Sequence, residues 1–261
     1  MRLSDILFTI IILLIISFSI YLFISNYFIK PVEKVVEKNA LIVDTVRDIH
    51  LNNTLIRKIG NILIKSGYNV TTCLSENFTV NFVKKLYKYD LIILRVHSTV
   101  TNTPLQFLGN GSVAIITGEI YRKDRYTWDQ LNERLLPSSL LPQTGIVYGY
   151  FAFKRLFILN YIPKFRNATI IVMGCHSLYS SDMAEACISK GAKIYIGWNG
   201  YVTPEHMDKA LYRLIYYLYV RKECVGKAVM EVMMEIGRDP EYGAELKFYP
   251  IQAYDYKPSG G

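Results

Sequence analysis

Cysteine and histidine are scarce in this chain, which has 261 residues and contains four of each. A structural zinc site usually takes about four such side chains at short, regular spacings. His97, Cys175 and His176 would supply three ligands, but no fourth follows at a recognisable spacing. We therefore expect no metal and no other cofactor, while four cysteines neither require nor exclude disulfide bonds.

Clusters of basic residues are also missing. The formal net charge of +8 would suit a nucleic-acid-binding protein, but the Lys and Arg residues are scattered over separate predicted elements. The sequence contains no motif that combines aromatic and basic residues in the way DNA- and RNA-binding modules do. The charge therefore indicates a solvated basic surface, and we expect no nucleic-acid partner.

Glutamine occurs only four times, beside abundant Ile, Lys and Tyr. This composition favours a thermophilic or archaeal source. Hydrophobic residues make up 51% of the chain and charged residues 20%, and no internal repeat is present. These proportions are typical of one globular domain of moderate size, with an additional anchor.

The anchor is predicted by one long apolar run near the N-terminus. Residues 6–24 carry no charge and have about the 20 residues that cross a bilayer. A secretory signal peptide has a shorter apolar region that ends in a small-x-small cleavage site. We therefore predict an uncleaved transmembrane signal anchor in residues 1–29. A charged linker follows in residues 30–39, and its KPVEKVVEK pattern favours a helix.

Charges on the two sides of the apolar run do not decide its orientation. Glycosylation sequons of the form N-x-S/T favour one side, because they are used outside the cytoplasm. Five asparagines begin such sequons: Asn52, Asn69, Asn77, Asn110 and Asn167. We therefore expect a single-pass membrane glycoprotein whose C-terminal domain is extracytoplasmic.

Strand-type and helix-type patterns alternate along residues 40–255. The strand-type segments begin at Ala40, Tyr68, Asp90, Ser112, Ala168 and Lys193. The helix-type segments cover residues 51–67, 79–89, 180–192 and 224–237, with another beginning at Thr203. Residues 121–165 are less regular, with a helix expected around Trp128–Leu135. This alternation predicts an α/β domain with a mostly parallel sheet and helices on both faces, followed by a flexible tail in residues 256–261.

Two of the predicted strands end in reactive side chains: LIILRVH ends at His97 and IIVMGC ends at Cys175. The carboxyl ends of parallel strands lie along one edge of a sheet, so the two side chains meet if the strands are neighbours. A cysteine nucleophile acts as a thiolate, and an imidazole can take up and return its proton. Gly174 would let a substrate approach closely, and the Cys175 amide could face an oxyanion.

The order of these features resembles the caspase-hemoglobinase fold of clan CD cysteine peptidases, nearest to the gingipain, separase and CHAT-domain branches. The resemblance covers about Ala40 to Pro250 and includes the stretch SKGAKIYIGWNGYVTPEHMDKALYRLIYYL after the cysteine. It implies a three-layer sandwich in which His97 is the general base or acid and Cys175 is the nucleophile. The amides of Ser98 and Cys175 would then bind the oxyanion.

The chain departs from the family pattern at two points. Ser98 stands where the family usually has glycine, and His176-Ser177-Leu178 stands where a small or glycine-rich turn is common. A catalytically inactive relative is therefore an open alternative. His176 is an alternative base, although an adjacent residue seldom aims its ring at its neighbour's sulfur.

Three further side chains are candidates for a substrate pocket. Glu119 ends a strand-type segment and Asp182 begins a helix-type one, and either carboxylate would pair with a basic substrate side chain. Their alternative interpretations are a surface acid at a strand end and an acid that interacts with the helix dipole. Trp198 is either a wall of the pocket or a core residue.

Cys187 and Cys224 both follow the candidate nucleophile in the sequence. In an oxidising exterior, buried cysteines tend to form disulfides. We therefore expect these two residues either to pair with each other or to be core residues.

The sequence as a whole predicts a membrane-anchored cysteine endopeptidase that acts on protein or peptide substrates through His97 and Cys175. The alternative is an inactive domain that binds a protein or a surface polymer. A reactive Cys175 would be alkylated quickly at neutral pH, whereas a buried one would not. The sequence leaves the oligomeric state open.

If the domain lies outside the cytoplasm, protease added to intact cells that carry the protein should remove the domain and leave the anchor in the membrane. Immunoblotting with antibodies against each end measures this. Protection of the whole chain until the membrane is opened would contradict the predicted topology.

Overall fold

The computed structural model describes residues 2–27, 37–101, 111–139 and 149–258. Most of the expected charged linker, the sequon asparagine Asn110 and the last three residues of the expected tail lie outside these ranges. The chain divides into two compact units, Met1–Val36 and Glu37–Gly261.

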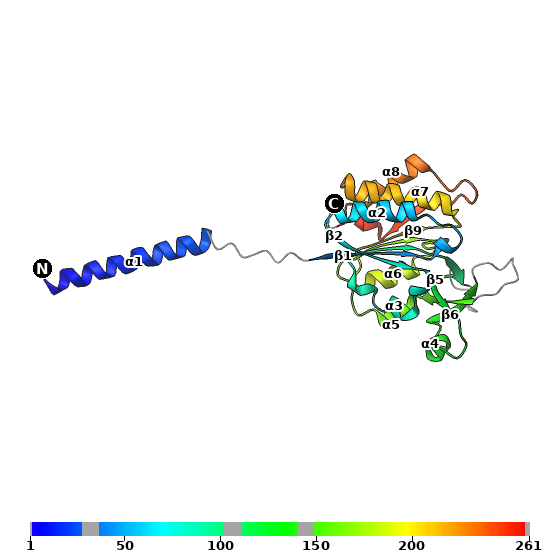
Figure 1. The fold of residues 1–261 in the computed structure, drawn as a ribbon, viewed down its shortest axis with the longest axis horizontal. Coiled ribbons are helices and arrows are strands. Elements are labelled where there is room, and N and C mark those ends of the chain that lie inside the picture. Colours follow the sequence, from blue (N-terminus) through cyan, green and yellow to red (C-terminus); the bar gives the residue numbers. More distant parts are fainter. Residues whose placement is uncertain (1, 28–36, 102–110, 140–148, 259–261) are drawn as a thin grey trace. The chain divides into compact units, whose positions relative to one another are not determined.

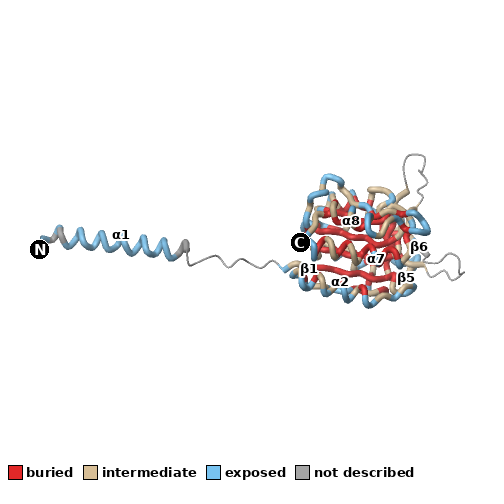
Figure 2. Tube along the Cα trace, turned by 90° about the horizontal axis from the view of Figure 1, so that it is seen from above, coloured by how far each residue is buried: buried red, intermediate tan, exposed pale blue. Residues whose placement is uncertain are grey.

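The first unit contains helix α1 (Leu3–Tyr27). Its segment Ile6–Ile24 is long and apolar enough to cross a membrane, as the sequence predicts. Figure 2 shows that residues 6–24 of the helix are exposed, and their large apolar side chains include Phe8, Leu13 and Leu14. A helix that is apolar on every side has no polar face for water, which is typical of a membrane span.

The second unit is built around a mixed, mostly parallel sheet, which confirms the predicted α/β class. Within the described residues this sheet has six strands in the order β10-β9-β8-β3-β1-β2. Their bounds are β1 (Lys38–Asp44), β2 (Tyr68–Leu74), β3 (Leu91–Arg95), β8 (Thr169–Met173), β9 (Ile194–Trp198) and β10 (Leu246–Tyr249). Strands β2, β1, β3, β8 and β9 are parallel, and β10 is antiparallel to β9. The central strands β3 and β8 are buried throughout, because helices cover both faces.

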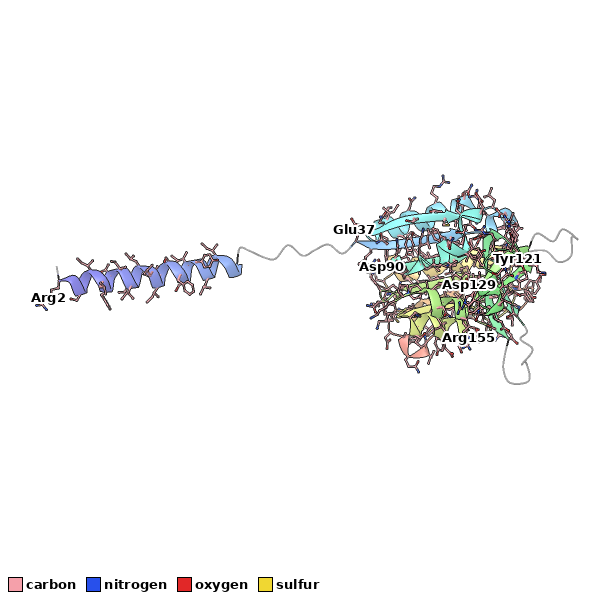
Figure 3. All side chains as sticks on the ribbon, turned by 90° about the horizontal axis from the view of Figure 1, so that it is seen from below. Arg2, Glu37, Asp90, Tyr121, Asp129 and Arg155 are labelled. Carbon is pink, nitrogen blue, oxygen red and sulfur yellow. The ribbon has the colours of Figure 1, made fainter. Side chains whose placement is uncertain are left out.

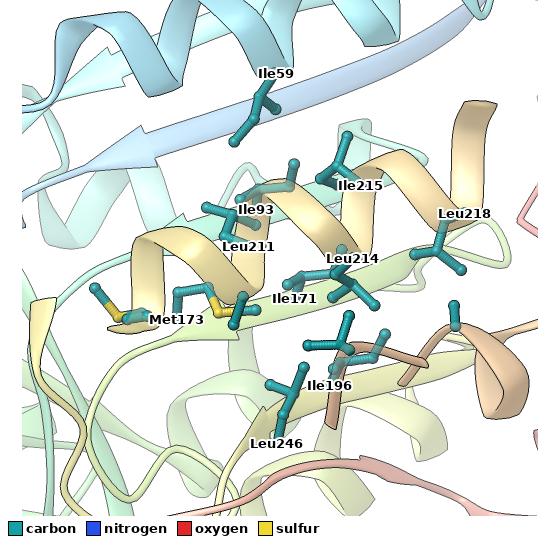
Figure 4. Packing of buried hydrophobic residues seen from close by; sticks show 14 of the residues in the cluster. Ile59, Ile93, Ile171, Met173, Ile196, Leu211, Leu214, Ile215, Leu218 and Leu246 are labelled. Atoms are coloured by element: carbon teal, nitrogen blue, oxygen red, sulfur yellow. The ribbon is translucent and has the colours of Figure 1, made fainter. Parts of the chain in front are cut away.

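Helices α2 (Asn53–Lys65), α7 (Pro204–Ile215) and α8 (Val225–Ile236) cover one face of the sheet, and α3 (Val80–Val83), α5 (Arg155–Tyr161) and α6 (Asp182–Ser189) cover the other (Figure 1). Each face has its own buried apolar cluster. Figure 4 shows the first cluster, in which Leu211 and Leu214 of α7 pack over Ile171 of β8. Burial of these aliphatic side chains is the main stabilising contribution to the layered arrangement.

A second sheet follows β3 in the chain and departs from the simple alternation of strands and helices. Within the described part of the chain it is antiparallel with the order β4-β5-β7-β6. Its strands are β4 (Ser98–Thr101), β5 (Ser112–Ile120), β6 (Leu135–Ser139) and β7 (Gly149–Lys154). Helix α4 (Thr127–Leu131) lies in the sequence between β5 and β6 and is shorter than the helix expected around Trp128–Leu135. The segment that begins at Ser112 is therefore a strand, as predicted, but it belongs to this second sheet.

Short helical turns complete the domain. The helix predicted for residues 79–89 is divided into α3 and the 3₁₀ turn η3 (Leu86–Lys88). The remaining turns are η1 (Val46–Asp48), η2 (Ser75–Asn77), the π-helical turn η5 (Tyr216–Val220) that extends α7, and η6 (Ile251–Ala253). In Figure 3, Glu37 and Asp90 mark the end of the domain where the chain enters the sheet, and Tyr121 lies at the other end.

All four cysteines lie in the described part of the chain, and all are free. Cys187 belongs to α6 and is buried in the cluster on the α3, α5 and α6 face. Cys224 is the N-cap residue of α8, which packs on the opposite face. The expected Cys187–Cys224 disulfide is therefore wrong, because the sheet separates the two residues.

A buried ion network joins the carboxyl ends of two central strands to α7. Arg95, the last residue of β3, is fully buried between Asp44 of β1 and Asp208 of α7. Its Nη1 donates to Asp44 Oδ1 at 2.6 Å, and its Nε donates to Asp208 Oδ1 at 2.7 Å. Its Nη2 also donates to Asp208 Oδ2 and to the His50 carbonyl, both at 3.0 Å. These bonds satisfy the guanidinium and offset part of the cost of burying the charges, although burial still raises the pKa of Asp44.

Replacing Arg95 with Met should leave the Asp44 and Asp208 carboxylates buried without their cation. We expect the free energy of unfolding to fall by about 3–5 kcal/mol. Urea denaturation of the full-length protein in detergent measures this change. The control is Arg122→Met, because the Arg122–Asp124 pair is exposed and such pairs contribute only about 0–1 kcal/mol. Equal losses in the two variants would contradict the assigned role of the network.

Candidate functional site

His97 and Cys175 follow neighbouring parallel strands. β3 pairs with β8, and Arg95 is the register partner of Met173. Beyond the strands the chains stay together, because Val96 N donates to the Met173 carbonyl at 3.0 Å and the Ser98 hydroxyl donates to the Cys175 carbonyl at 2.6 Å. The structure therefore brings His97 and Cys175 together at the carboxyl edge of the sheet. No hydrogen bond between described residues joins their side chains, and such bonds are often absent without substrate.

Gly174 is required by this close approach of the two chains. A Cβ atom at Gly174 would lie 2.5 Å from the Val96 carbonyl oxygen and 2.5 Å from the Ser98 hydroxyl. Atoms at that distance clash, so any larger residue would push apart the segments that carry His97 and Cys175. The glycine before the cysteine thus has a structural reason that the sequence alone did not reveal.

The Cys175 side chain is half-buried beside the cluster that contains α7. Its Sγ lies 3.6 Å from the Val202 carbonyl oxygen, to which the thiol donates. Burial raises the pKa of Cys175 above that of an ordinary thiol, and the Asp239 carboxylate acts in the same direction. At neutral pH the resting group is therefore a thiol rather than a thiolate.

The His97 imidazole is neutral at the same pH. Burial lowers the pKa of His97 to about 4, and the positive charge of Arg95 adds to this effect, while Asp48 opposes it. The buried Nε2 atom has no hydrogen-bond partner among the described residues. Burying a polar atom without a hydrogen-bond partner lowers the stability of the fold, so it needs an explanation. One explanation is that Nε2 accepts a proton when substrate is bound.

His176 adopts a left-handed backbone conformation with φ of 57°. Its ring packs against Tyr201 with a centroid distance of 4.2 Å and against Tyr179 with a centroid distance of 5.4 Å. Burial lowers the pKa of His176. Its Nδ1 is also buried without a hydrogen-bond partner among the described residues, and no described contact links either histidine ring to the Cys175 thiol, so the choice between the two bases stays a prediction.

The Glu119 carboxylate is buried in the second sheet, where its partners are protein groups. It accepts from the Val80 amide at 2.9 Å and forms an ion pair with Arg125 at 2.8 Å. Val80 begins α3, which covers the opposite face of the main sheet from the one that Cys175 contacts. Glu119 therefore does not join His97 and Cys175.

Asp182 is likewise engaged within the protein. It begins α6 and accepts from the Ser112 hydroxyl at 2.6 Å and from the Val113 amide at 3.2 Å. These bonds fasten α6 to β5, again on the face opposite to that of the Cys175 side chain. The structural interpretation of this residue fits its contacts better than a role in a substrate pocket.

Trp198 is fully buried in β9. Its indole Nε1 donates to the Met173 sulfur at 3.4 Å, and its backbone amide donates to the Ser177 hydroxyl at 2.9 Å. The sequence left Trp198 as either a wall of the pocket or a core residue, and its burial supports the core residue.

Asp239 is a residue near Cys175 that the sequence did not single out. Its carboxylate is buried and accepts from the Thr203 amide at 2.9 Å, the Thr203 hydroxyl at 2.9 Å and the Tyr242 amide at 2.8 Å. Burial alone would raise the pKa of Asp239, but these amide bonds hold it below its usual value. α7 begins at Pro204 after Thr203, as predicted, but the Thr203 hydroxyl binds Asp239 instead of capping the helix. The only sequence feature that could have pointed to Asp239 is its place shortly after Gly237, the glycine that ends α8.

Two cavities lie beside α7. One, of about 350 Å³, is lined by residues that include His50, Glu205 and Asp208. The other, of about 620 Å³, is lined by residues that include Lys209, Arg213 and Arg238. Neither is lined by His97 or Cys175. Across the described ranges, no group of three or more His, Cys, Asp and Glu side chains is placed to hold a metal ion.

No known family model matches this chain, and no curated protein matches it significantly. Its function is therefore inferred from the geometry at the carboxyl edge of the sheet.

The lowered pKa of His97 predicts a pH-dependent stability. The unfolded chain binds a proton at this residue near pH 6.5, whereas the folded chain does so only near pH 4. Between these values the unfolded state binds more protons, so the free energy of unfolding should fall as the pH is lowered from 6.5 to 4. The contribution of His97 to the slope approaches about 1.4 kcal/mol per pH unit.

Urea denaturation of the full-length protein in detergent at several pH values tests this. His97→Gln should show a shallower slope than the unaltered protein between pH 6.5 and pH 4. Cys224→Ala leaves all histidines in place and should keep the original slope. A His97→Gln variant with an unchanged slope would show that the imidazole is not held neutral in the folded state.

Proposed function

We propose that the protein is a membrane-anchored cysteine endopeptidase of the caspase-like, clan CD type, with His97 and Cys175 as its catalytic dyad. The observation that carries the proposal is the buried, unpartnered Nε2 of a neutral His97, which follows β3, the strand that pairs with the one before Cys175. A buried imidazole without a partner has little structural value, whereas a base beside a nucleophile needs a free nitrogen.

The resting protonation states define the first step. Cys175 begins as a thiol and His97 as a neutral imidazole, so the proton leaves Sγ for the imidazole as the sulfur attacks the substrate carbonyl carbon. The new S–C bond forms a tetrahedral oxyanion. His97 then gives the proton to the leaving amine as the C–N bond breaks, and a water hydrolyses the acyl-enzyme with His97 again as the base.

Backbone amides of Ser98 and Cys175 are the proposed donors to the oxyanion. The Ser98 hydroxyl already donates to the Cys175 carbonyl at 2.6 Å, so this side chain holds the two segments together. The family usually has a conformationally free glycine at this position. Here the serine hydroxyl bond fixes the position of the backbone instead.

The proposed location is the outer side of a cell membrane, with α1 as the single span. Among the described sequons, Asn69, Asn77 and Asn167 are exposed and can carry a glycan. Asn52 differs, because its Oδ1 accepts from the Leu55 amide at 3.1 Å and its Nδ2 donates to Asp208 at 2.9 Å. Asn52 is therefore part of the contacts around the buried ion network.

A second candidate function is a catalytically silent domain that binds a protein or a surface polymer. The raised pKa of Cys175 favours it, since a thiol is a poor nucleophile. The silent domain is also favoured by Ser98, which stands in the place of the family's glycine. The pairing of Glu119 and Asp182 within the protein favours it too, since neither carboxylate is free for a substrate.

Peptidase activity of variants separates the two candidates. Cys175→Ala should abolish the cleavage of an unfolded protein such as denatured casein, and His97→Ala should reduce it by about 10²–10⁴-fold. Cys224→Ala should retain activity, which controls for the loss of another half-buried cysteine, and His176→Ala should lose far less activity than His97→Ala. Cleavage by Cys175→Ala at the rate of the unaltered protein would refute the endopeptidase. An unaltered protein that cleaves no substrate would refute it as well.

A further inference from the structure

Three exposed tyrosines lie close to Cys175 although they come from separate segments of the chain. The exposed fractions are 48% for Tyr179, 57% for Tyr201 and 52% for Tyr242. Their rings form a continuous series with the His176 ring, with centroid distances of 5.4 Å from Tyr179 to His176, 4.2 Å from His176 to Tyr201 and 5.7 Å from Tyr201 to Tyr242. We call these four residues the tyrosine surface.

The backbone places the tyrosine surface next to the thiol. The His176 amide donates to the Gly200 carbonyl at 2.8 Å, and the Cys175 Sγ lies 3.6 Å from the Val202 carbonyl oxygen. Tyr201 stands between these two acceptors in the sequence, so its segment runs directly alongside Cys175 and His176.

The tyrosine surface is also held in place. Asp239 accepts from the Thr203 amide at 2.9 Å and from the Tyr242 amide at 2.8 Å, which joins the segments that carry Tyr201 and Tyr242. These bonds fix the backbone of the two segments, which reduces the conformational entropy that a ligand must remove on binding. Tyrosine offers a large apolar ring with a polar tip, which suits contact surfaces that must also tolerate water.

The carboxylates near the thiol are poorly suited to hold a basic substrate side chain. Asp239 is already bound by Thr203 and Tyr242, and Glu119 and Asp182 lie on the opposite face of the sheet. Among the described residues, Glu241 is an exposed carboxylate next to Tyr242 and is the rival to be tested.

We propose that the tyrosine surface binds an apolar or aromatic side chain of the peptide substrate, adjacent to the bond that Cys175 attacks. This inference rests on the proposed function, because it assigns the substrate class of the same site. Tyr201 is the main contact, since its ring lies between His176 and Tyr242.

Peptidyl chloromethyl ketones that differ only in the side chain next to the electrophile test the proposal. The rate of Cys175 labelling in the full-length protein in detergent is measured by intact mass spectrometry for probes with Phe, Ala, Arg and Asp side chains. We expect the Phe probe to react about 10-fold faster than the Ala probe, because its ring can pack against Tyr201, and this ratio corresponds to about 1.4 kcal/mol.

Variants of the surface identify the contact. Tyr201→Ser and Tyr242→Ser should each reduce labelling by the Phe probe several-fold, while leaving the rate with iodoacetamide unchanged, which also verifies that the thiol environment is intact. Tyr201→Phe should keep the preference for the Phe probe. The control is Trp128→Ser in α4, an exposed aromatic residue outside the tyrosine surface, which should change no rate.

The outcomes separate the inference from the proposed function. Labelling by peptide probes with no preference for Phe, or with a preference for Arg that Glu241→Gln removes, would overturn the inference and leave the peptidase standing. A Phe preference that survives Tyr201→Ser and Tyr242→Ser would also overturn it. A Cys175 that iodoacetamide labels but no peptide probe does would overturn both.

Discussion

The pairing of β3 with β8 is the interaction on which the rest of the candidate site depends. The two strands run parallel in register, and the contact continues beyond them because Gly174 leaves room for the Val96 carbonyl and the Ser98 hydroxyl. Ser98 then fixes the Cys175 carbonyl. Without this close approach, His97 and Cys175 would be two unrelated residues at strand ends, as they are in the sequence.

The charge buried beneath this edge links the stability of the fold to the chemistry proposed for it. Arg95 holds β1, β3 and α7 together through Asp44 and Asp208, and its positive charge helps burial to keep the pKa of His97 low. A neutral imidazole and a protonated thiol follow from the same low-dielectric surroundings that make the core stable. The proposed dyad is therefore a pair of neutral groups at rest, and in the proposed reaction a bound substrate would supply the conditions for proton transfer.

Much of the fold was predictable because the responsible signals are local. Apolar β-branched runs mark β1, β3 and β8, and Thr203-Pro204 marks the start of α7. The membership of β5 was not predictable, since a strand's sequence does not state which sheet receives it. The Cys187–Cys224 pairing was wrong for a related reason, because sequence order does not tell on which face of a sheet a helix packs.

The sequence by itself determined the apolar N-terminal helix, the alternation of strands and helices, and the two reactive residues at strand ends, because each depends on neighbouring residues only. The tertiary structure decided that the strands before His97 and Cys175 are adjacent, that Glu119 and Asp182 are occupied by partners of their own, and that Trp198 is a core residue. It also assembled the tyrosine surface and the contacts of Asp239 from segments far apart in the chain. Adjacency, burial and hydrogen-bond pairing depend on which distant residues come into contact and exclude water. Only the folded arrangement of the whole domain specifies these contacts.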